Sequence, residues 1–295
     1  MFKNIIFYNL VDFDLDDDSL TQALQKSPFE PCPKFSLKST GWVGPAGGDT
    51  EYVRSINGAT LVTLCNESKT LPGSLIKLKL AEKVAEHKAR HQEAPSKKEV
   101  RMLKEDVKME LTPNAFPKQT VTNILLSSDR RWLAVDAASA SKAEEVLAYL
   151  RSDLGSLKVT PLTVSANVEP VFTQWLTSQS LPEKVSLPGD GTLSDQDGGQ
   201  LTCRNLDLFS DEVGMHLKAG KTVTKLTIDF DQRMTFTLDG TLILKGLKFD
   251  GSLVPKIEDE EDDDIAKACY LADGWITSLA PELEIVNSFL NDHFV

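Results

Sequence analysis

The fold is decided by the stretch from Leu75 to Leu111, which reads LIKLKLAEKVAEHKARHQEAPSKKEVRMLKEDVKMEL. Its apolar residues and histidines recur every three or four positions, which is the spacing of one face of an α-helix. Pro95 interrupts the pattern, and Ser96 with Glu99 forms a capping box that starts a second helix. The shared faces consist of Leu80, Val84, His87 and His91 in the first helix and of Val100, Leu103, Val107 and Leu111 in the second. The stretch therefore predicts a helical hairpin that ends at Thr112-Pro113.

Strand and helix patterns alternate on both sides of this hairpin. Before it we expect a strand around Ile5–Phe7, a short helix at Asp16–Lys26, and a turn at Asn57-Gly58 that leads into a strand at Thr60–Leu64. After it we expect strands at Val121–Leu126, Trp132–Val135 and Lys158–Val164, with a helix at Lys142–Leu154. Beyond the polar stretch 178–199 the predicted elements are a helix near Ser210–Lys218, strands at Thr222–Phe230, Met234–Leu238 and Thr241–Leu244, and a helix near Tyr270–Leu279.

These elements predict an α+β fold with mixed or antiparallel sheets, an inserted helical hairpin and a second α+β region. The expected division is a central sheet domain at 1–74 and 117–177, the hairpin at 75–116, and the second α+β domain at 178–295. A length of 295 residues fits about two domains of roughly 100–200 residues each. Because 41% of the residues are hydrophobic, the chain has enough apolar material to form cores, which excludes disorder throughout.

The composition also indicates the compartment. No apolar run approaches the roughly 18–20 residues that span a bilayer, and Asp12 and Asp14 come too soon after Met1 for a signal-peptide core. The four cysteines lie far apart and form no C-x-x-C pair, which favours reduced thiols over disulfides or zinc ligands. We therefore expect a cytoplasmic protein. The acidic run Glu258–Asp264 is predicted to be a solvated loop.

The net charge of −12 conceals a strong asymmetry along the chain. Between Lys69 and Lys118 there are 12 Lys and Arg against 7 Asp and Glu, a net charge of +5. The rest of the chain has 20 against 37, a net charge of −17. The average argues against a simple basic nucleic-acid binder, but the segment that carries the helical hairpin is basic within an acidic protein.

The basic residues of the hairpin line up on narrow helix faces. At 100° per residue, Lys97, Arg101, Lys104 and Lys108 fall within about 60° of one another and extend over about 16 Å. On the first helix, Lys79, Lys83 and Arg90 share a face in the same way. Like charges at this spacing weaken a helix by a few tenths of a kcal/mol per pair, a cost that a polyanionic ligand would offset. The pattern fits either a non-specific phosphate-binding face or a solvated face with local ion pairs.

Three patterns imitate catalytic or metal sites, but each lacks part of the required motif. Gly214 and Gly220-Lys221 are separated by five residues, whereas a phosphate-binding loop needs four and leads from a strand to a helix. The aspartates at 12, 14 and 16 begin like an EF-hand loop, but its sixth position is Asp17 and its twelfth is Ala23. His87 and His91 have metal-binding spacing without an evident third ligand. We therefore expect no catalytic residues, no metal and no cofactor.

Several short motifs in order along the chain resemble the RdgC recombination-associated proteins. These motifs are Phe2-Lys3-Asn4, Gly41-Trp42-Val43, Asn57-Gly58 before a strand that ends in Cys65, Leu71-Pro72 before Ile76-Lys77, LTPNAF at 111–116, VDAASA at 135–140 and LGSL at 154–157. The most distinctive is AGKTVTKL at 219–226, which continues to Asp229 and Gln232-Arg233. Each motif is weak alone, but the ordered set covers nearly the whole chain and is specific.

The resemblance implies a ring-shaped homodimer that encircles duplex DNA without sequence preference and restrains RecA-promoted strand exchange. Single-stranded DNA is a further expected partner, and the expected location is the nucleoid. The family has a central sheet domain, a helical tip and a base domain; dimer contacts at tip and base close the ring, and basic side chains line its hole. The helical hairpin would be the tip, with its basic stripes facing the DNA.

The resemblance also implies DNA-binding roles outside the stripes. Phe116 matches a family phenylalanine linked to ring closure and DNA binding, although an ordinary core aromatic is an equal alternative. Lys221 and Lys225 match family lysines, and strand alternation places Lys225 opposite the apolar face, whereas Lys221 fits a loop charge equally well. Where the family often has a Lys-Lys-Gln gate, this chain has Arg204, Asn205 and Leu206, so one cation remains.

Two other function classes stay open from the sequence. An acidic protein-interaction module or DNA mimic would bind a basic partner and no DNA. A metal-dependent nuclease would degrade DNA in the presence of magnesium.

Overall fold

The structure is a computed structural model that describes residues 2–47, 51–163, 168–256 and 264–295. The chain forms two compact units. The core unit comprises Met1–Lys26, Val43–Thr63 and Thr122–Val295, and the hairpin unit comprises Ser27–Trp42 and Leu64–Val121. Among the described residues, none of the helices combines the length and the apolar character that crossing a bilayer requires.

The strands form a largely antiparallel sheet. Within the described ranges it has 13 strands, in the main order β10-β9-β11-β12-β13-β1-β6-β5-β4-β2, with β3, β7 and β8 pairing off this path. Strand β1 (Asn4–Leu10) pairs with β13 (Leu244–Phe249) on one side and with β6 (Trp132–Val135) on the other. The predicted α+β fold class with antiparallel sheet is therefore confirmed.

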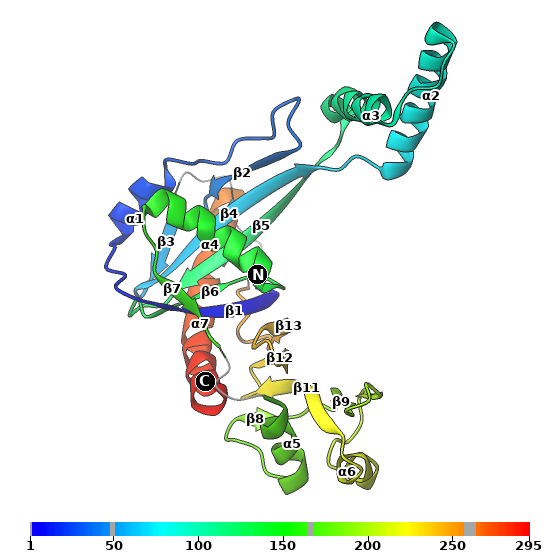
Figure 1. Cartoon of the computed structure of the whole chain (residues 1–295). Helices are drawn as coiled ribbons and strands as arrows, with labels where there is room; N and C mark the ends of the chain where they lie inside the picture. The colour runs from blue at the N-terminus through cyan, green and yellow to red at the C-terminus, as the bar shows by residue number, and fades with distance from the viewer. Residues whose placement is uncertain (1, 48–50, 164–167, 257–263) are drawn as a thin grey trace. The chain divides into compact units, whose positions relative to one another are not determined.

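The first part of the core unit combines these strands with two helices. Helices α1 (Asp17–Leu24) and α4 (Ala140–Leu154) lie side by side over the strands (Figure 1). The predicted turn at Asn57-Gly58 is confirmed: it joins β3 (Val53–Ile56) to β4 (Ala59–Lys69), and both turn residues have positive φ. Short β7 (Val159–Pro161) pairs with β1.

The second part of the core unit contains the remaining strands and three helices. Its strands are β8 (Val185–Ser186), β9 (Gly191–Ser194), β10 (Gln200–Cys203), β11 (Thr222–Phe230), β12 (Met234–Asp239) and β13. Its helices are α5 (Val168–Ser178), α6 (Asp211–Lys218) and α7 (Asp264–Phe294). Buried aromatic rings join α5, β11 and α7: Phe172 contacts Phe294 at 5.6 Å and Phe230 contacts Phe289 at 5.2 Å between ring centroids.

The C-terminal helix and α5 differ from the sequence prediction. Helix α7 was expected to span only Tyr270–Leu279, but it continues through Pro281 because Leu283, Val286 and Leu290 on the next turns are buried in the core. Helix α5 was not predicted; its Pro170 lies in the first turn, where a missing N–H costs nothing.

Two other predictions also changed. The strand expected at Thr241–Leu244 starts at Leu244, because Asp239 accepts hydrogen bonds from Thr241 in a turn and Leu242 has positive φ. Val164, at the end of an expected strand, lies outside the described residues. Residues 258–263 of the acidic run also lie outside them, and Asp264 begins α7 rather than ending a loop.

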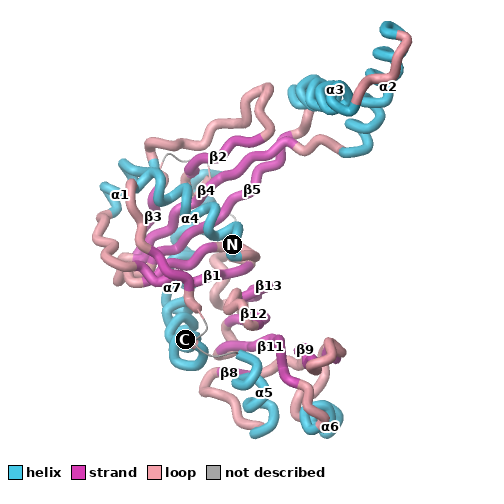
Figure 2. The backbone as a smooth tube through the Cα atoms, viewed as in Figure 1, coloured by secondary structure: helices cyan, strands magenta, loops and turns pink. Residues whose placement is uncertain are grey.

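The hairpin unit contains the two predicted helices (Figure 2). They are α2 (Gly73–His91) and α3 (Lys97–Leu111), followed by a single 3₁₀ turn, η1, at Thr112–Asn114. The capping box is confirmed, since Ser96 N–H donates to Glu99 Oε2 at 2.7 Å and Glu99 N–H donates to Ser96 Oγ at 3.4 Å. Strands β2 (Lys38–Val43), β4 and β5 (Pro117–Leu126) each begin in one unit and end in the other.

Candidate nucleic-acid interface

Four of the five cations of α3 share one face of the helix, and three of these four are exposed. Lys97, Arg101 and Lys104 are exposed, and in the described part of the chain they take part in no ion pair. Lys108 is half-buried and pairs with Glu105 at 2.7 Å. On the same helix only Val107 is fully buried, so α3 packs along a narrow edge and leaves the rest of its surface open. Hereafter the four cations together are the α3 stripe.

The cations of α2 behave differently from those of α3. Lys79 pairs with Glu82 on its own helix at 2.7 Å, and Lys83 forms an ion pair with Glu110 of α3. Lys83 therefore holds the two helices of the hairpin together, and its charge is partly neutralised. Arg90 is exposed near the end of the helix. The structure thus divides the predicted α2 face into one bridging lysine, one locally paired lysine and one solvated arginine.

The two histidines lie near the capping box at the start of α3. Their ring centroids lie 4.4 Å apart, and His87 Nε2 lies 3.9 Å from Glu99 Oε1. The pKa of Glu99 is lowered, mainly by its hydrogen bonds with Ser96 and further by the two histidines. Over the residues that the structure describes, no three His, Cys, Asp or Glu side chains are arranged to hold a metal ion. His87 is half-buried beside Glu99 of α3, whereas His91 is exposed.

Phe116 is not a core aromatic. Its side chain is 89% exposed, in the short link between η1 and β5. The alternative that it fills the core is therefore wrong. Met102 and Met109 of α3 are also exposed, so the hairpin unit presents apolar side chains as well as cations to solvent.

The candidate residues of the core unit are scattered over separate elements. Alternation along β11 is confirmed, with Leu226, Ile228 and Phe230 buried and Lys225 exposed. Lys221 instead pairs with Asp195 at 2.6 Å and lowers the pKa of that carboxyl group.

The gate-like positions follow β10. Arg204 is exposed, and the Asn205 N–H donates to Asp190 Oδ1 at 2.9 Å from a positive-φ conformation. Leu206 packs against the hydrophobic core. Of these three residues, only Arg204 can therefore offer a charge to a ligand.

Sequence reasoning missed one exposed aromatic. Phe35, in the loop before β2, is 72% exposed and has Lys34 beside its ring. The signal was a phenylalanine placed between lysines in a proline-rich stretch, which has neither helix nor strand periodicity.

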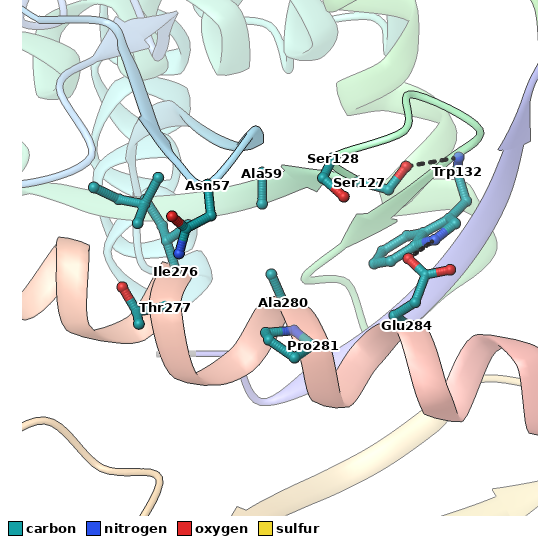
Figure 3. A pocket seen from close by; sticks show the side chains of 11 residues that line it. Asn57, Ala59, Ser127, Ser128, Trp132, Ile276, Thr277, Ala280, Pro281 and Glu284 are labelled. Atoms are coloured by element: carbon teal, nitrogen blue, oxygen red, sulfur yellow. Dashed lines mark hydrogen bonds between the residues drawn. The ribbon is translucent and has the colours of Figure 1, made fainter.

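The core unit also contains a small cavity between the β3–β4 turn and α7 (Figure 3). Its volume is about 120 Å³, and its polar lining includes Asn57, Ser127, Thr277 and Glu284. The Trp132 indole N–H donates to Glu284 Oε2 at 2.8 Å, so this carboxylate oxygen already has a hydrogen-bond partner within the protein. Ligand pockets usually measure about 300–1,000 Å³, so the cavity is too small for a nucleotide cofactor.

The geometry as a whole suits a polyanion. Exposed cations in a row can contact successive phosphates, and such contacts do not depend on base sequence. The α3 stripe is the one set of predicted residues that the structure brings onto a single face; the remaining candidates are paired, solitary or separated in the fold.

Comparison with known proteins identifies the family of the sequence. A family model described as "Putative exonuclease, RdgC" matches residues 1–286. The chain belongs to the RdgC family. The family resemblance of the short motifs is thereby confirmed.

Three RdgC relatives match equally well. The "Recombination-associated protein RdgC" of Yersinia enterocolitica serotype O:8 / biotype 1B is 36% identical over 270 residues, which is 90% of this chain and 89% of the relative. The proteins of the same name from Yersinia pestis strain Pestoides F and Yersinia pseudotuberculosis serotype O:1b show the same identity and coverage. The RdgC family description and the relatives' name thus point to different activities, nuclease in one case and recombination in the other.

Proposed function

We propose that this RdgC-family protein binds duplex DNA without sequence preference, as a ring-shaped homodimer that encircles the DNA and restrains RecA-mediated homologous recombination at the nucleoid. The observation that carries the proposal is the α3 stripe, four cations on one helix face of which three are exposed and unpaired among the described residues, in a protein of net charge −12. The relatives' shared name, which refers to recombination, supports the same direction.

Electrostatics explains why an acidic protein can bind DNA in this way. Fields of exposed charges are screened over about 8 Å at physiological ionic strength, so a phosphate at the stripe responds mainly to the nearby cations. Distant carboxylates repel DNA from other surfaces and disfavour binding there. Charge segregation of this kind selects one face for the DNA.

Enclosure compensates for weak individual contacts. Each phosphate contact releases a counterion and is weakened by salt, so four or more cations per subunit give moderate affinity. A closed ring keeps dissociated DNA at high effective concentration near the same cations. We accordingly propose that 75–116 acts as the tip, 1–74 with 117–177 as the central domain, and 178–295 as the base, with a second copy meeting the exposed Met102, Met109 and Phe116.

The remaining candidate residues have graded roles in this proposal. Lys79, Lys83, Arg90, Arg204 and Lys225 would add to the field along the DNA, whereas the charge of Lys221 is largely satisfied by Asp195. Phe116 would contribute to ring closure at the tip. The proposed activity requires no catalytic residue, metal or cofactor.

Retention on circular DNA tests the proposal most directly. The protein is loaded on a closed circular plasmid and on the same plasmid cut once, and both are washed at high salt. We expect retention on the circle and loss from the linear form, because a ring slides off free ends, and a molar mass in solution of twice the 32.5 kDa chain. Equal release from both forms, or a monomeric mass, contradicts the enclosed ring.

The same samples distinguish the competing activities. An acidic protein-interaction module or DNA mimic would bind neither plasmid, even at low salt. An exonuclease would shorten the linear plasmid on a denaturing gel when magnesium is added, whereas a DNA-encircling protein leaves its length unchanged.

A further inference from the structure

The loop 27–37, which precedes β2, presents an aromatic ring among lysines. Phe35 lies near its end and is 72% exposed. Lys34 Nζ lies 5.9 Å from the ring centroid, and Lys38 follows at the start of β2. Figure 1 shows the loop in blue, leading into β2. We call residues 27–37 the Phe35 loop.

A buried carboxylate holds the Phe35 loop to β4 and β5. Glu67 on β4 is only 4% exposed, and its carboxylate accepts the Cys32 N–H at 2.6 Å and the Gln119 side-chain N–H at 2.8 Å. These hydrogen bonds lower the pKa of Glu67, with the larger effect from Gln119. The carboxylate is therefore ionised at neutral pH and fixes the middle of the loop.

A lysine on β4 holds the part of the loop next to Phe35. Lys69 Nζ donates to the carbonyl oxygens of Pro33 at 2.8 Å and Lys34 at 3.2 Å. The backbone N–H of Lys69 also donates to the Leu37 carbonyl at 2.9 Å. Lys69 thus bonds to neutral acceptors and brings a positive charge to the part of the loop that carries Phe35.

The exposure of Phe35 is consequently built into the loop. Pro31 and Pro33 restrict the backbone, and the bonds to Glu67 and Lys69 oppose the rearrangement that would bury the ring. A phenylalanine left in water forgoes about 1.5–3 kcal/mol of burial free energy. A ligand that covers the ring recovers this free energy. Because the loop is already ordered, binding does not carry the entropic cost of ordering it.

The chemistry of the loop favours a single-stranded nucleic acid as that ligand. Proteins hold single strands by stacking bases on exposed aromatic rings while cations follow the phosphates. Phe35 supplies the ring, and Lys34, Lys38 and Lys69 supply the cations. In a duplex the faces of the bases are covered by their neighbours, so only unpaired bases can stack on the ring. An uncharged apolar protein partner would gain nothing from the three lysines.

We propose that Phe35 stacks on an unpaired base of single-stranded DNA, while Lys34, Lys38 and Lys69 contact the flanking phosphates. This site rests on the proposed DNA-binding function and adds to it a contact specific for single strands. It would allow the protein to recognise single-stranded DNA by a surface that the α3 stripe does not include.

The test compares the variants F35A, F35L and F35W with the unchanged protein. Binding is measured by fluorescence anisotropy with a labelled oligo(dT) and with a duplex of the same length. We expect F35A and F35L to weaken oligo(dT) binding about 5- to 100-fold, the range for loss of one stacked base, and F35W to retain it. Duplex affinity should stay within about twofold in all three variants, because paired bases do not reach the ring.

A matched control separates stacking from general loss of apolar surface. Val121 is also exposed in the hairpin unit, on β5, so V121A should leave both affinities unchanged. An oligonucleotide with one 2-aminopurine should show quenched fluorescence in complex with the unchanged protein and recovered fluorescence with F35A. Circular dichroism confirms that the variants fold.

The three outcomes distinguish this site from the broader function. If F35L retains the single-strand affinity that F35A loses, Phe35 makes an apolar contact and the stacking proposal is overturned. If all variants bind oligo(dT) equally, the site is wrong while duplex binding still stands. If the unchanged protein binds neither DNA, both proposals fail.

Discussion

At the residue scale, Gly41 allows two segments of the hairpin unit to meet. A Cβ atom at this position would lie 2.4 Å from Phe29 Cα and 2.5 Å from the Pro28 carbonyl oxygen. The close approach is held by hydrogen bonds from Trp42 N–H to the Ser27 carbonyl at 2.9 Å and from Phe29 N–H to the Trp42 carbonyl at 2.8 Å. Trp42 is buried behind this contact. The start of the Phe35 loop can therefore pack this closely only because residue 41 has no side chain.

We expect Gly41→Ala to lower the free energy of unfolding by about 1–3 kcal/mol, because the clash is with backbone that cannot rotate away. The midpoint of urea unfolding, followed by circular dichroism, measures the change. Gly73→Ala is the matched control, since a Cβ at Gly73 meets nothing within 4 Å and its φ is not positive. Equal midpoints for the two variants would mean that the backbone at Phe29 moves to accept the Cβ atom without loss of stability.

At the scale of the element, α3 can serve as the proposed DNA-binding face because little of its surface packs against other elements. Its capping box fixes its start, and one buried valine with a few half-buried neighbours fixes its orientation. The stripe lies on the open side and makes one local ion pair, Lys108 with Glu105. Charge changes on this face should therefore alter DNA binding with little effect on folding.

Reversing the stripe to Lys97→Glu, Arg101→Glu, Lys104→Glu and Lys108→Glu should abolish duplex binding, because the reversed charges repel phosphates. Without bound DNA, the variant should no longer inhibit RecA strand exchange. Dimerisation should persist, as measured by light scattering. Single neutral substitutions should each reduce the slope of log affinity against log salt by about 0.9 for every phosphate that the variant no longer binds.

The control for this reversal changes four core-unit lysines by the same total charge. Lys26, Lys142, Lys158 and Lys184 all lie outside the proposed interface, and their change to Glu should weaken binding far less. Similar reductions in affinity for both variants would show that net charge, rather than the stripe, governs binding.

At the scale of the whole molecule, the carboxylates govern how stability depends on pH. Among the described residues, six of them have pKa values lowered by hydrogen bonds with neighbouring side chains, whereas burial raises the pKa of Asp136. The six are Asp16 with Ser19, Glu67 with Gln119, Glu99 with Ser96, Asp195 with Lys221, Asp239 with Lys245 and Asp250 with Ser252. Several of these bonds fix turns and helix starts rather than any part of the core.

The sign of the pH dependence follows from these directions. A carboxylate with a lowered folded pKa stabilises the fold above its unfolded pKa of about 4, and this contribution is lost as pH falls through the folded value. Asp136 acts in the opposite sense, stabilising at low pH and losing that contribution as pH rises. With six groups against one, we expect the midpoint of urea unfolding to fall between about pH 5 and pH 2. A midpoint that stays constant or rises on acidification would contradict this balance.

Local patterns in the sequence were sufficient for much of the fold. The hairpin helices, the capping box at Ser96, the turn at Asn57-Gly58 and the alternation along β11 all depend on residues a few positions apart. Their geometry is set by backbone periodicity and local hydrogen bonds, so neighbouring residues suffice to predict them. The helical register of the α3 stripe was predictable for the same reason.

By itself the sequence determined the hairpin helices, the strands with clear alternation and which side chains share a face of each, but not helix α5 or the full length of α7. Only the tertiary structure decided that Phe116 and Phe35 are exposed, that Lys83 pairs with Glu110 and Lys221 with Asp195, and that α7 continues through Pro281. Exposure and charge pairing depend on residues that are distant along the chain, and these distances are fixed only when the whole chain packs. A helix likewise tolerates a proline when the burial of its next turns outweighs one missing hydrogen bond.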